Sequence, residues 1–382
     1  MDSYHQTYKG EKDMNVLFLT VSTGHGHTSC ARALEVYLKE NGANTYFLDI
    51  YGYIKPFLSK AVSDIYLFAS GKTPKLYGKY YDKEDMGKTK FVDTMSKVNK
   101  VIKNKFKKFI IKYDIDVVVC THIFAAQIMT MLKDSVDTVN IGIVTDYTLH
   151  PKWETTDIDY YVTADESLSY IAEKKGIAKE KLLPFGIPTD KKFTIKGDKT
   201  AARKKLGFNK DKVIFVMMGS MGYGNLDTII DEIDGCDIDF EVAVACGNNS
   251  KAKDMILAKN LKHKFHAYGF INNVDEFMDA ADCIITKPGG LSVTESMAKN
   301  LPMILVDPIP GQEDRNVEFL VNNGTALYVW NLYGLGSAIN IFYNNAVRRN
   351  ELMTALSRMA KPNAVSDLGN FILSIKQGNK KK

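Results

Sequence analysis

The sequence predicts an α/β protein made of two facing Rossmann-like domains, each built on a doubly wound parallel sheet. Three observations lead to this fold class. The chain has 382 residues, which is more than one typical domain of about 150 residues holds. Short apolar runs rich in Val and Ile alternate along it with segments of helical periodicity, as strands and crossover helices do in parallel sheets. These runs lack polar–apolar alternation, which is typical of strands covered by helices on both faces.

The predicted strands form two groups. A cluster of Pro, Gly, Lys and Asp at residues 186–200 separates them, and such clusters are typical of linkers. We therefore expect a first domain over residues 1–190, a second over residues 191–345, and C-terminal helices over residues 346–382. The predicted strands are residues 16–22, 45–50, 117–121, 141–145, 160–163, 213–219, 241–245, 283–286 and 303–306.

Composition excludes several classes of protein. Hydrophobic residues make up 45% and charged residues 25% of the chain, as in ordinary globular proteins. The 5 cysteines lack CxxC spacing, so buried reduced thiols are expected rather than disulfides or a metal site. Residues 1–13 lack the apolar core of a signal peptide, and no run approaches the roughly 20 apolar residues of a membrane span. We expect a soluble or peripheral protein.

One segment carries an asymmetric charge. Residues 95–113 contain seven lysines and no acidic residue, with apolar residues at helical spacing. This predicts a basic amphipathic helix, which is either a surface helix with a solvated lysine face or a site of adhesion to an anionic membrane. Residues 51–81 upstream are rich in Tyr and Phe, which suit a membrane interface. Nucleic acid is the competing partner, but no nucleic-acid-binding module is visible.

The most informative stretch is residues 284–295, where an apolar strand runs into Gly289 and Gly290 and a helix begins. The first turn of a helix carries unpaired N–H groups and the positive end of the helix dipole. A diphosphate is the natural ligand for this turn, which contains Ser292. Glu295, one turn further on, can accept hydrogen bonds from a ribose diol.

A second stretch, residues 308–316, supplies polar side chains on a loop. Gln312 and Glu313 are expected to hold sugar hydroxyls, and Asn316 is assigned to the phosphate or to the loop geometry. Together with the Gly-Gly turn, this chemistry predicts that a nucleotide sugar binds in the C-terminal half.

Two further glycine-rich turns follow predicted strands. The backbone at Gly219 and the hydroxyl of Ser220 form a second set of donors for phosphate. Lys287 is either a phosphate partner or a surface lysine. Near the N-terminus, residues 24–27 read Gly-His-Gly-His, and these glycines let the backbone turn sharply and approach a ligand.

These motifs resemble those of a known family. The two stretches in the C-terminal half look like the donor site of the glycosyltransferases that make monogalactosyl- and diglucosyl-diacylglycerol, which are related to the lipid II-forming N-acetylglucosaminyltransferase. The resemblance implies the two-domain GT-B fold, with the last helix packing back on the first domain. It keeps its order over residues 14–330 and includes the segments 22–27, 144–146, 150–153, 186–188 and 268–270.

The resemblance also implies roles for individual residues. His27 takes the position of the family's histidine, as general base for the acceptor hydroxyl or as a group that orients the lipid head; helix capping is the alternative. Asp146 would orient His27, act as the base itself, or cap a turn. Phe270 matches the uracil-binding position.

The acceptor side is expected to include Gly24, His25 and Gly26. Trp153 belongs to the segment that looks like the relatives' acceptor loop. There it would stack on a sugar or line a lipid groove, and core packing is the alternative.

No metal ion or other cofactor is expected. Asp-x-Asp pairs often bind a divalent cation in transferases, but each pair in this chain directly precedes a predicted strand, as solvated turns do. We expect helix ends and hydrogen bonds to stabilise the leaving-group charge instead. The pairs are Asp114/Asp116, Asp157/Asp159 and Asp237/Asp239.

The expected function is inverting transfer of a hexose from UDP-glucose or UDP-galactose to diacylglycerol at the cytoplasmic face of the membrane. Addition of a second hexose is plausible by resemblance. Three alternatives stay open: a UDP-N-acetylglucosamine 2-epimerase, N-acetylglucosaminyl transfer to lipid II, and a non-catalytic UDP-sugar sensor.

Overall fold

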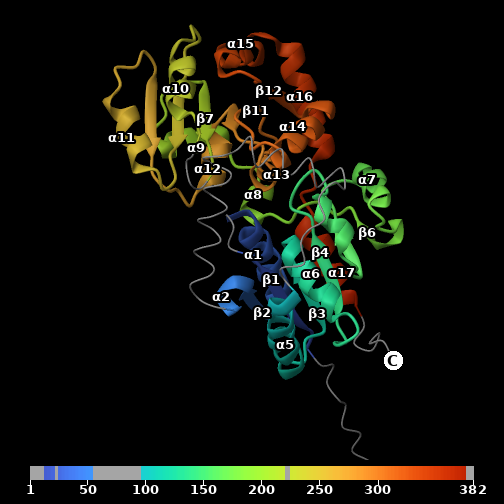
Figure 1. Cartoon of the computed structure of the whole chain (residues 1–382). Coiled ribbons are helices and arrows are strands. Elements are labelled where there is room, and N and C mark those ends of the chain that lie inside the picture. Colours follow the sequence, from blue (N-terminus) through green and yellow to red (C-terminus); the bar gives the residue numbers. More distant parts are fainter. Residues whose placement is uncertain (1–12, 22–24, 55–95, 220–223, 376–382) are drawn as a thin grey trace, which may run out of the picture.

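The computed structural model describes residues 13–21, 25–54, 96–219 and 224–375, and these contain two six-stranded sheets (Figure 1). The strand order is β2-β1-β3-β4-β5-β6 in the first sheet and β12-β11-β10-β7-β8-β9 in the second. All paired strands are parallel. Helices alternate with the strands along the chain, so the predicted α/β fold class is confirmed.

The strands of the first sheet are β1 (Asn15–Thr20), β2 (Asn44–Asp49), β3 (Val117–Cys120), β4 (Val139–Ile143), β5 (Tyr160–Val162) and β6 (Leu182–Leu183). The helices of this half are α1 (His25–Glu40), α2 (Ile50–Ile54), α5 (Ser96–Lys112), α6 (Ile123–Leu132) and α7 (Ser169–Lys174), with 3₁₀ helices η1 (Pro151–Thr155), η2 (Glu166–Leu168) and η3 (Lys179–Lys181).

The strands of the second sheet are β7 (Val213–Met217), β8 (Glu241–Ala245), β9 (Lys264–Tyr268), β10 (Cys283–Thr286), β11 (Met303–Leu305) and β12 (Ala326–Tyr328). The helices that follow the first sheet are α8 (Lys191–Thr194), α9 (Lys199–Leu206), α10 (Leu226–Asp234), α11 (Ser250–Ala258), α12 (Val274–Ala280), α13 (Gly290–Ala298), α14 (Gln312–Asn322), α15 (Leu335–Asn344), α16 (Ala346–Met359) and α17 (Ala364–Ser374), with the 3₁₀ helix η4 (Leu332–Gly334).

Every predicted strand is present, with its ends shifted by at most two residues. The strands β6, β9 and β12 were not predicted, and each lies at the edge of a sheet. The strand β6 has 2 residues and β12 has 3. The strand β9 is longer, but it carries Lys264 and His266 and is only partly buried. Because an edge strand is covered less completely than a central one, it does not need the apolar run on which the prediction depended.

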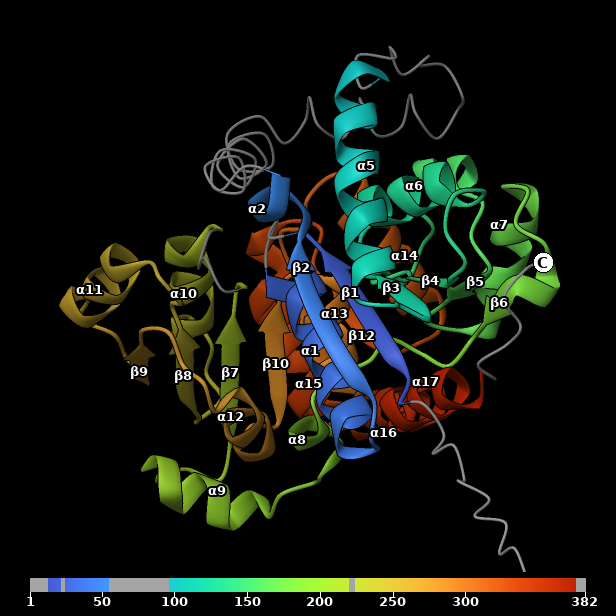
Figure 2. The same ribbon diagram turned by 90° about the horizontal axis from the view of Figure 1, so that it is seen from below.

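The predicted basic helix is present as α5. Ile102, Phe106 and Ile110 are buried in the core, whereas Lys105 and Lys108 are exposed. The apolar face of this helix therefore packs against the core, and Lys105 and Lys108 stay at the surface. Figure 2 shows α5 close to α6 and on the same side of the molecule as α2.

Most of the aromatic-rich segment at residues 51–81 lies outside the described residues. Within the described ranges, no helix combines the length and the apolar character needed to cross a bilayer.

Within the residues that the structure describes, the chain passes between the two halves twice. The first crossing follows Gly186, between β6 and α8, and the second lies at Lys361, between α16 and α17. We propose the first crossing as the domain boundary, and we call the parts built on the two sheets the N-terminal and C-terminal domains.

Among the described elements after the first crossing, only the last helix returns to the N-terminal domain. The helix α17 packs against α1, where the Tyr37 hydroxyl donates to Asn370 Oδ1 at 2.9 Å and Gly369 leaves room for the Tyr37 ring. The preceding helix α16 packs against α13 and α15 instead. The segment 346–382 was predicted as one unit, but its described residues, 346–375, are divided between the two domains.

We predict that Gly186→Ala destabilises the protein more than Gly176→Ala does. Both glycines have left-handed backbone angles, with φ of +96° and +78°, so each alanine costs about 1–2 kcal/mol of backbone strain. At Gly186 the new methyl group would also lie 2.5 Å from Lys361 Cβ, whereas nothing lies within 4 Å at Gly176. Overpacking of this kind adds about 1–3 kcal/mol. Urea denaturation of the two variants measures the difference, and equal midpoints would contradict a tight crossing.

Candidate active site

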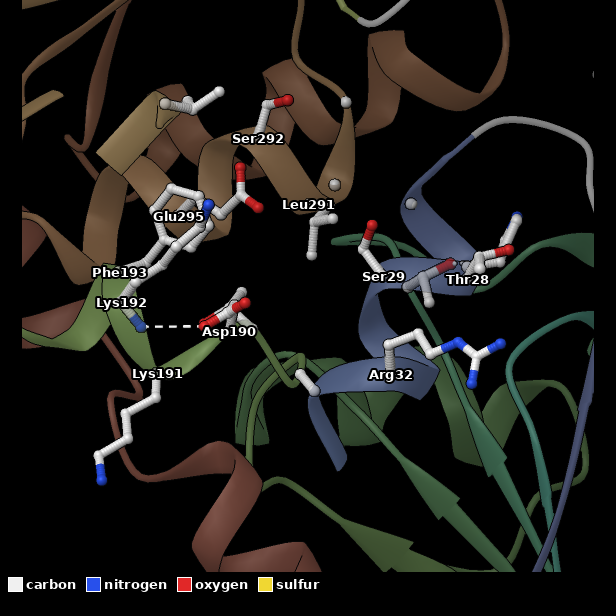
Figure 3. A pocket seen from close by; sticks show the side chains of 18 of the residues that line it. Thr28, Ser29, Arg32, Asp190, Lys191, Lys192, Phe193, Leu291, Ser292 and Glu295 are labelled. Atoms are coloured by element: carbon white, nitrogen blue, oxygen red, sulfur yellow. Dashed lines mark hydrogen bonds between the residues drawn. The ribbon is translucent and has the colours of Figure 1, made fainter. Parts of the chain in front are cut away.

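A cleft of about 860 Å³ lies between the two domains. Its lining comes from α1, α8, α13, α14 and α17 and from segments at the ends of the strands β4, β6, β7, β8, β9 and β10. Figure 3 shows Ser29 and Arg32 of α1 on one side and Phe193, Ser292 and Glu295 on the other. The carboxyl ends of parallel strands are where ligands bind in such folds.

His27 lies in this cleft with a defined tautomer. Its Nδ1 is 2.6 Å from the carbonyl oxygen of Thr121 and 3.2 Å from Thr145 Oγ1. Because a carbonyl can only accept, Nδ1 carries the proton, and the neutral ring keeps a lone pair on Nε2. Burial lowers the pKa of His27, although the charge of Asp146 opposes this effect. His27 is therefore neutral near pH 7 and able to accept a proton.

A second histidine, which the sequence reasoning missed, packs against His27. The rings of His122 and His27 meet edge to face, with centroids 4.9 Å apart. The Nδ1 of His122 accepts the N–H of Phe124 at 3.1 Å and caps α6. Burial holds the pKa of His122 well below its usual value. Its position directly after a predicted strand was the signal that could have identified it.

Asp146 is held by two side-chain amides of α14. Gln312 Nε2 donates to Asp146 Oδ2 at 2.6 Å, and Asn316 Nδ2 donates to Asp146 Oδ1 at 3.0 Å. Burial raises the pKa of Asp146, and these two amides and His27 act in the opposite direction. The carboxylate thus joins the N-terminal domain to the C-terminal domain.

The three residues predicted on a loop lie instead in the first turns of α14, and they occupy different environments. Gln312 and Glu313 line the cleft. Glu313 Oε2 accepts the N–H of Ile309 at 2.7 Å, and burial raises the pKa of Glu313 to about 7. Asn316 is fully buried and does not line the cleft, so the loop-geometry assignment fits its position and the phosphate assignment does not.

The start of α13 forms one wall of the cleft. Gly289, Gly290, Leu291 and Ser292 all line it, and the first N–H groups of the helix have no partner within the helix. Glu295 also lines the cleft, and burial raises its pKa to about 8.

Gly290 has no room for a side chain. A Cβ there would lie 1.9 Å from the carbonyl oxygen of Thr145. The second glycine of this turn is therefore required by the approach of the N-terminal domain.

Of the other residues predicted to bind the donor, some line the cleft and others do not. Gly219 lines it with φ of +79°, and Phe270 lines it with 53% of its surface exposed. Lys287 does not line the cleft, and its Nζ lies 3.9 Å from Asp307 Oδ2. Ser220 lies outside the described residues.

The predicted acceptor side is less complete. Gly26 lines the cleft and faces Leu291 of α13, whereas Gly24 and the side chain of His25 lie outside the described residues. Trp153 is buried, packs edge to face against Tyr161, and does not line the cleft. The core-packing alternative therefore fits Trp153, and an acceptor contact finds no support in its position.

Several lining residues were not predicted. Arg32 lies one turn beyond Ser29 on α1, so both face the cleft. Helical spacing after the glycine-rich motif could therefore have predicted Arg32. Lys192 and Phe193 come from α8, which lies in the segment that we read only as a linker.

Within the described ranges, no group of three or more His, Cys, Asp or Glu residues could hold a metal ion. Members of the Asp-x-Asp pairs instead form surface ion pairs, as solvated turns do: Asp157 with Lys181, and Asp239 with Lys210. Independence from metal stays a prediction.

Comparisons with known proteins agree with this geometry. The family model for monogalactosyldiacylglycerol synthase matches residues 27–189, and that for the C-terminal domain of glycosyltransferase family 28 matches residues 213–366. A processive diacylglycerol beta-glucosyltransferase from Bacillus licheniformis is 30% identical over 330 residues, which cover 82% of this chain and 83% of that protein. One from Bacillus cereus strain AH187 is 23% identical over 369 residues, covering 95% and 94%.

Solved structures share the fold. MurG from Acinetobacter baumannii matches with a TM-score of 0.64 and 13% identity, covering 95% of this chain and 100% of that one. Anabaena HepE in complex with UDP-glucose matches with a TM-score of 0.57 and 14% identity, at the same coverage. The architecture is therefore that of the GT-B glycosyltransferases, as predicted.

We predict that Glu313→Gln gains stability relative to the wild type as pH rises from about 5 to about 8. The folded pKa of Glu313 is about 7, above the usual value of 4.5. Its protonated form is thus favoured in the fold, and this contribution is lost as pH rises through 7. Glutamine cannot ionise and still accepts the Ile309 N–H. Urea midpoints at several pH values measure the effect, with exposed Glu318→Gln on the same helix as control. Parallel profiles for wild type and Glu313→Gln would contradict it.

Proposed function

This chain belongs to the diacylglycerol glycosyltransferase family and is a hexosyltransferase, and on that premise we propose that it moves a hexose from UDP-glucose or UDP-galactose to diacylglycerol. The main support for this proposal is a neutral histidine in the cleft. His27 Nδ1 donates its hydrogen to the Thr121 carbonyl. The start of α1 contacts the start of α13, where Gly26 faces Leu291.

The proposed reaction is a single displacement. The acceptor hydroxyl oxygen forms a bond to the anomeric carbon of the hexose while the bond from that carbon to the diphosphate breaks. The hydroxyl proton passes to Nε2 of His27, and UDP leaves with the bonding electrons, so the anomeric configuration inverts. The N–H groups at the start of α13 stabilise the charge that develops on the diphosphate.

The donor-side roles follow from the cleft lining. We assign the uracil to Phe270, the ribose diol to Glu295, and the hexose hydroxyls to Gln312 and Glu313. These four residues line one continuous cleft.

The diphosphate is assigned to the turns at Gly219-Ser220 and Gly289-Gly290, with Ser292 as a further partner. The positive end of the α13 dipole supports this placement.

The acceptor is a lipid, so the protein must reach a membrane. We propose that the exposed lysines of α5 bind an anionic surface at the cytoplasmic face of the membrane, each contributing about 1 kcal/mol. The buried positions of Ile102, Phe106 and Ile110 support electrostatic attachment rather than insertion of this helix.

The first test is an assay of the purified protein with UDP-glucose or UDP-galactose and micelles that contain diacylglycerol. We expect glycolipid formation that depends on the lipid and persists in EDTA. UDP release without lipid dependence, or a free epimerised sugar, would move the function to the epimerase class. Binding of UDP-sugar without turnover would favour a sensor, and recovery of activity on adding magnesium after EDTA would overturn metal independence.

We predict that His27→Ala and His27→Asn both lower kcat by about 10²–10⁴ with UDP binding retained. Asparagine can still donate a hydrogen bond to the Thr121 carbonyl, but it cannot accept a proton as a base. Steady-state kinetics and calorimetry of UDP binding measure the two effects. Activity in His27→Asn but not in His27→Ala would mean that His27 orients the acceptor rather than deprotonating it.

A further inference from the structure

We propose that Asn316 is a positioning residue that holds the donor-binding turn after Pro288 and the Asp146–Tyr147 segment after β4 at a fixed distance from one another. The inference rests on the proposed function and adds to it a residue that touches no substrate. Asn316 lies on the second turn of α14.

The amide of Asn316 makes three hydrogen bonds to two separate segments. Its Nδ2 donates to Asp146 Oδ1 at 3.0 Å and to the carbonyl oxygen of Pro288 at 2.9 Å. Its Oδ1 accepts the backbone N–H of Tyr147 at 2.8 Å. Pro288 directly precedes the glycines of the donor turn, whereas Asp146 and Tyr147 belong to the N-terminal domain. One side chain therefore bridges both walls of the cleft.

These bonds leave Asn316 unable to bind the donor itself. Both hydrogens of Nδ2 are already in use, and the residue is 0% exposed. A sugar hydroxyl or a phosphate would have to displace Asp146 or Pro288 to reach it. Because an amide has only two hydrogens to donate, its role is geometric.

Two neighbouring contacts show that this junction is closely packed. The Tyr147 hydroxyl and Thr294 Oγ1 of α13 are 2.8 Å apart, and the Tyr147 ring packs against Phe319 of α14. The carbonyl of Thr145 occupies the space that a Cβ of Gly290 would need. Three consecutive residues after β4 thus contact α13 and α14, and Asn316 contacts two of them.

The arrangement has a consequence for catalysis. Asp146 acts electrostatically on His27, and the Pro288 carbonyl fixes the turn that is proposed to hold the diphosphate. A shift at Asn316 would move Asp146 and the turn after Pro288 relative to His27. A misplacement of about 1 Å can cost about 10²-fold in rate.

The test compares Asn316→Asp with Asn323→Asp. Both variants make the same substitution, but Asn323 caps the far end of α14, where its Nδ2 donates to the Phe319 carbonyl. In Asn316→Asp a carboxylate oxygen replaces Nδ2 and faces Asp146, with His27 and Glu313 as the other titratable groups nearby. We expect kcat to fall by about 10²-fold near pH 8, with the UDP dissociation constant little changed.

The pH dependence separates positioning from simple loss of structure. Two carboxylates about 3 Å apart share a proton at low pH and repel each other when both ionise. The ratio of Asn316→Asp activity to wild-type activity should therefore fall as pH rises from about 6 to about 9, while the ratio for Asn323→Asp stays flat. Unchanged kcat in Asn316→Asp, or a loss of UDP affinity that accounts for the whole effect, would overturn the inference.

A third measurement does not depend on transfer. In Asn316→Ala the Tyr147 N–H loses its acceptor, so hydrogen exchange in residues 145–149 should accelerate. Unchanged exchange there would overturn the inference. If the wild type forms no glycolipid at all, the proposed function fails, and this exchange measurement still decides whether Asn316 holds the junction.

Discussion

The contact between the loop after β4 and the start of α13 is the constraint on which the cleft depends. The Thr145 carbonyl lies where a side chain of residue 290 would begin, so the two domains can approach only because Gly290 has no Cβ. From sequence, both glycines of this turn were assigned to the approach of a diphosphate. The structure assigns the second of them to contact between domains. A single turn thus serves the ligand and the junction together.

The fold could be predicted from the sequence because its central strands are buried on both faces and must be apolar. The edge strands β6, β9 and β12 could not be predicted, because a strand that is only partly buried does not need to be apolar. The role of His27 was predicted from the family resemblance, and the glycine-rich turn after the first strand alone was a weak signal. The bonds of Asn316 and the core position of Trp153 could not be predicted, because both depend on which distant segments meet. A sequence pattern shows whether an element is buried, but it does not show which distant elements pack against it.

Burial shapes the electrostatics of the cleft before any ligand arrives. It lowers the pKa of His27 and raises the pKa of Glu295 to about 8 and of Glu313 to about 7. All three groups therefore favour their neutral forms. A neutral histidine can accept a proton, and protonated carboxyl groups reduce the repulsion that a diphosphate would otherwise meet. The same desolvation thus favours proton transfer and anion binding.

The return of α17 to α1 also bears on how the chain is made. Tyr37 and Asn370, which form one hydrogen bond, are separated by 333 positions, and Leu368 and Ile372 are buried nearby. During synthesis the C-terminal domain emerges in full before the helix that covers α1. The N-terminal domain therefore reaches its final packing only after the C-terminal domain has been made, although its own sheet comes first in the chain.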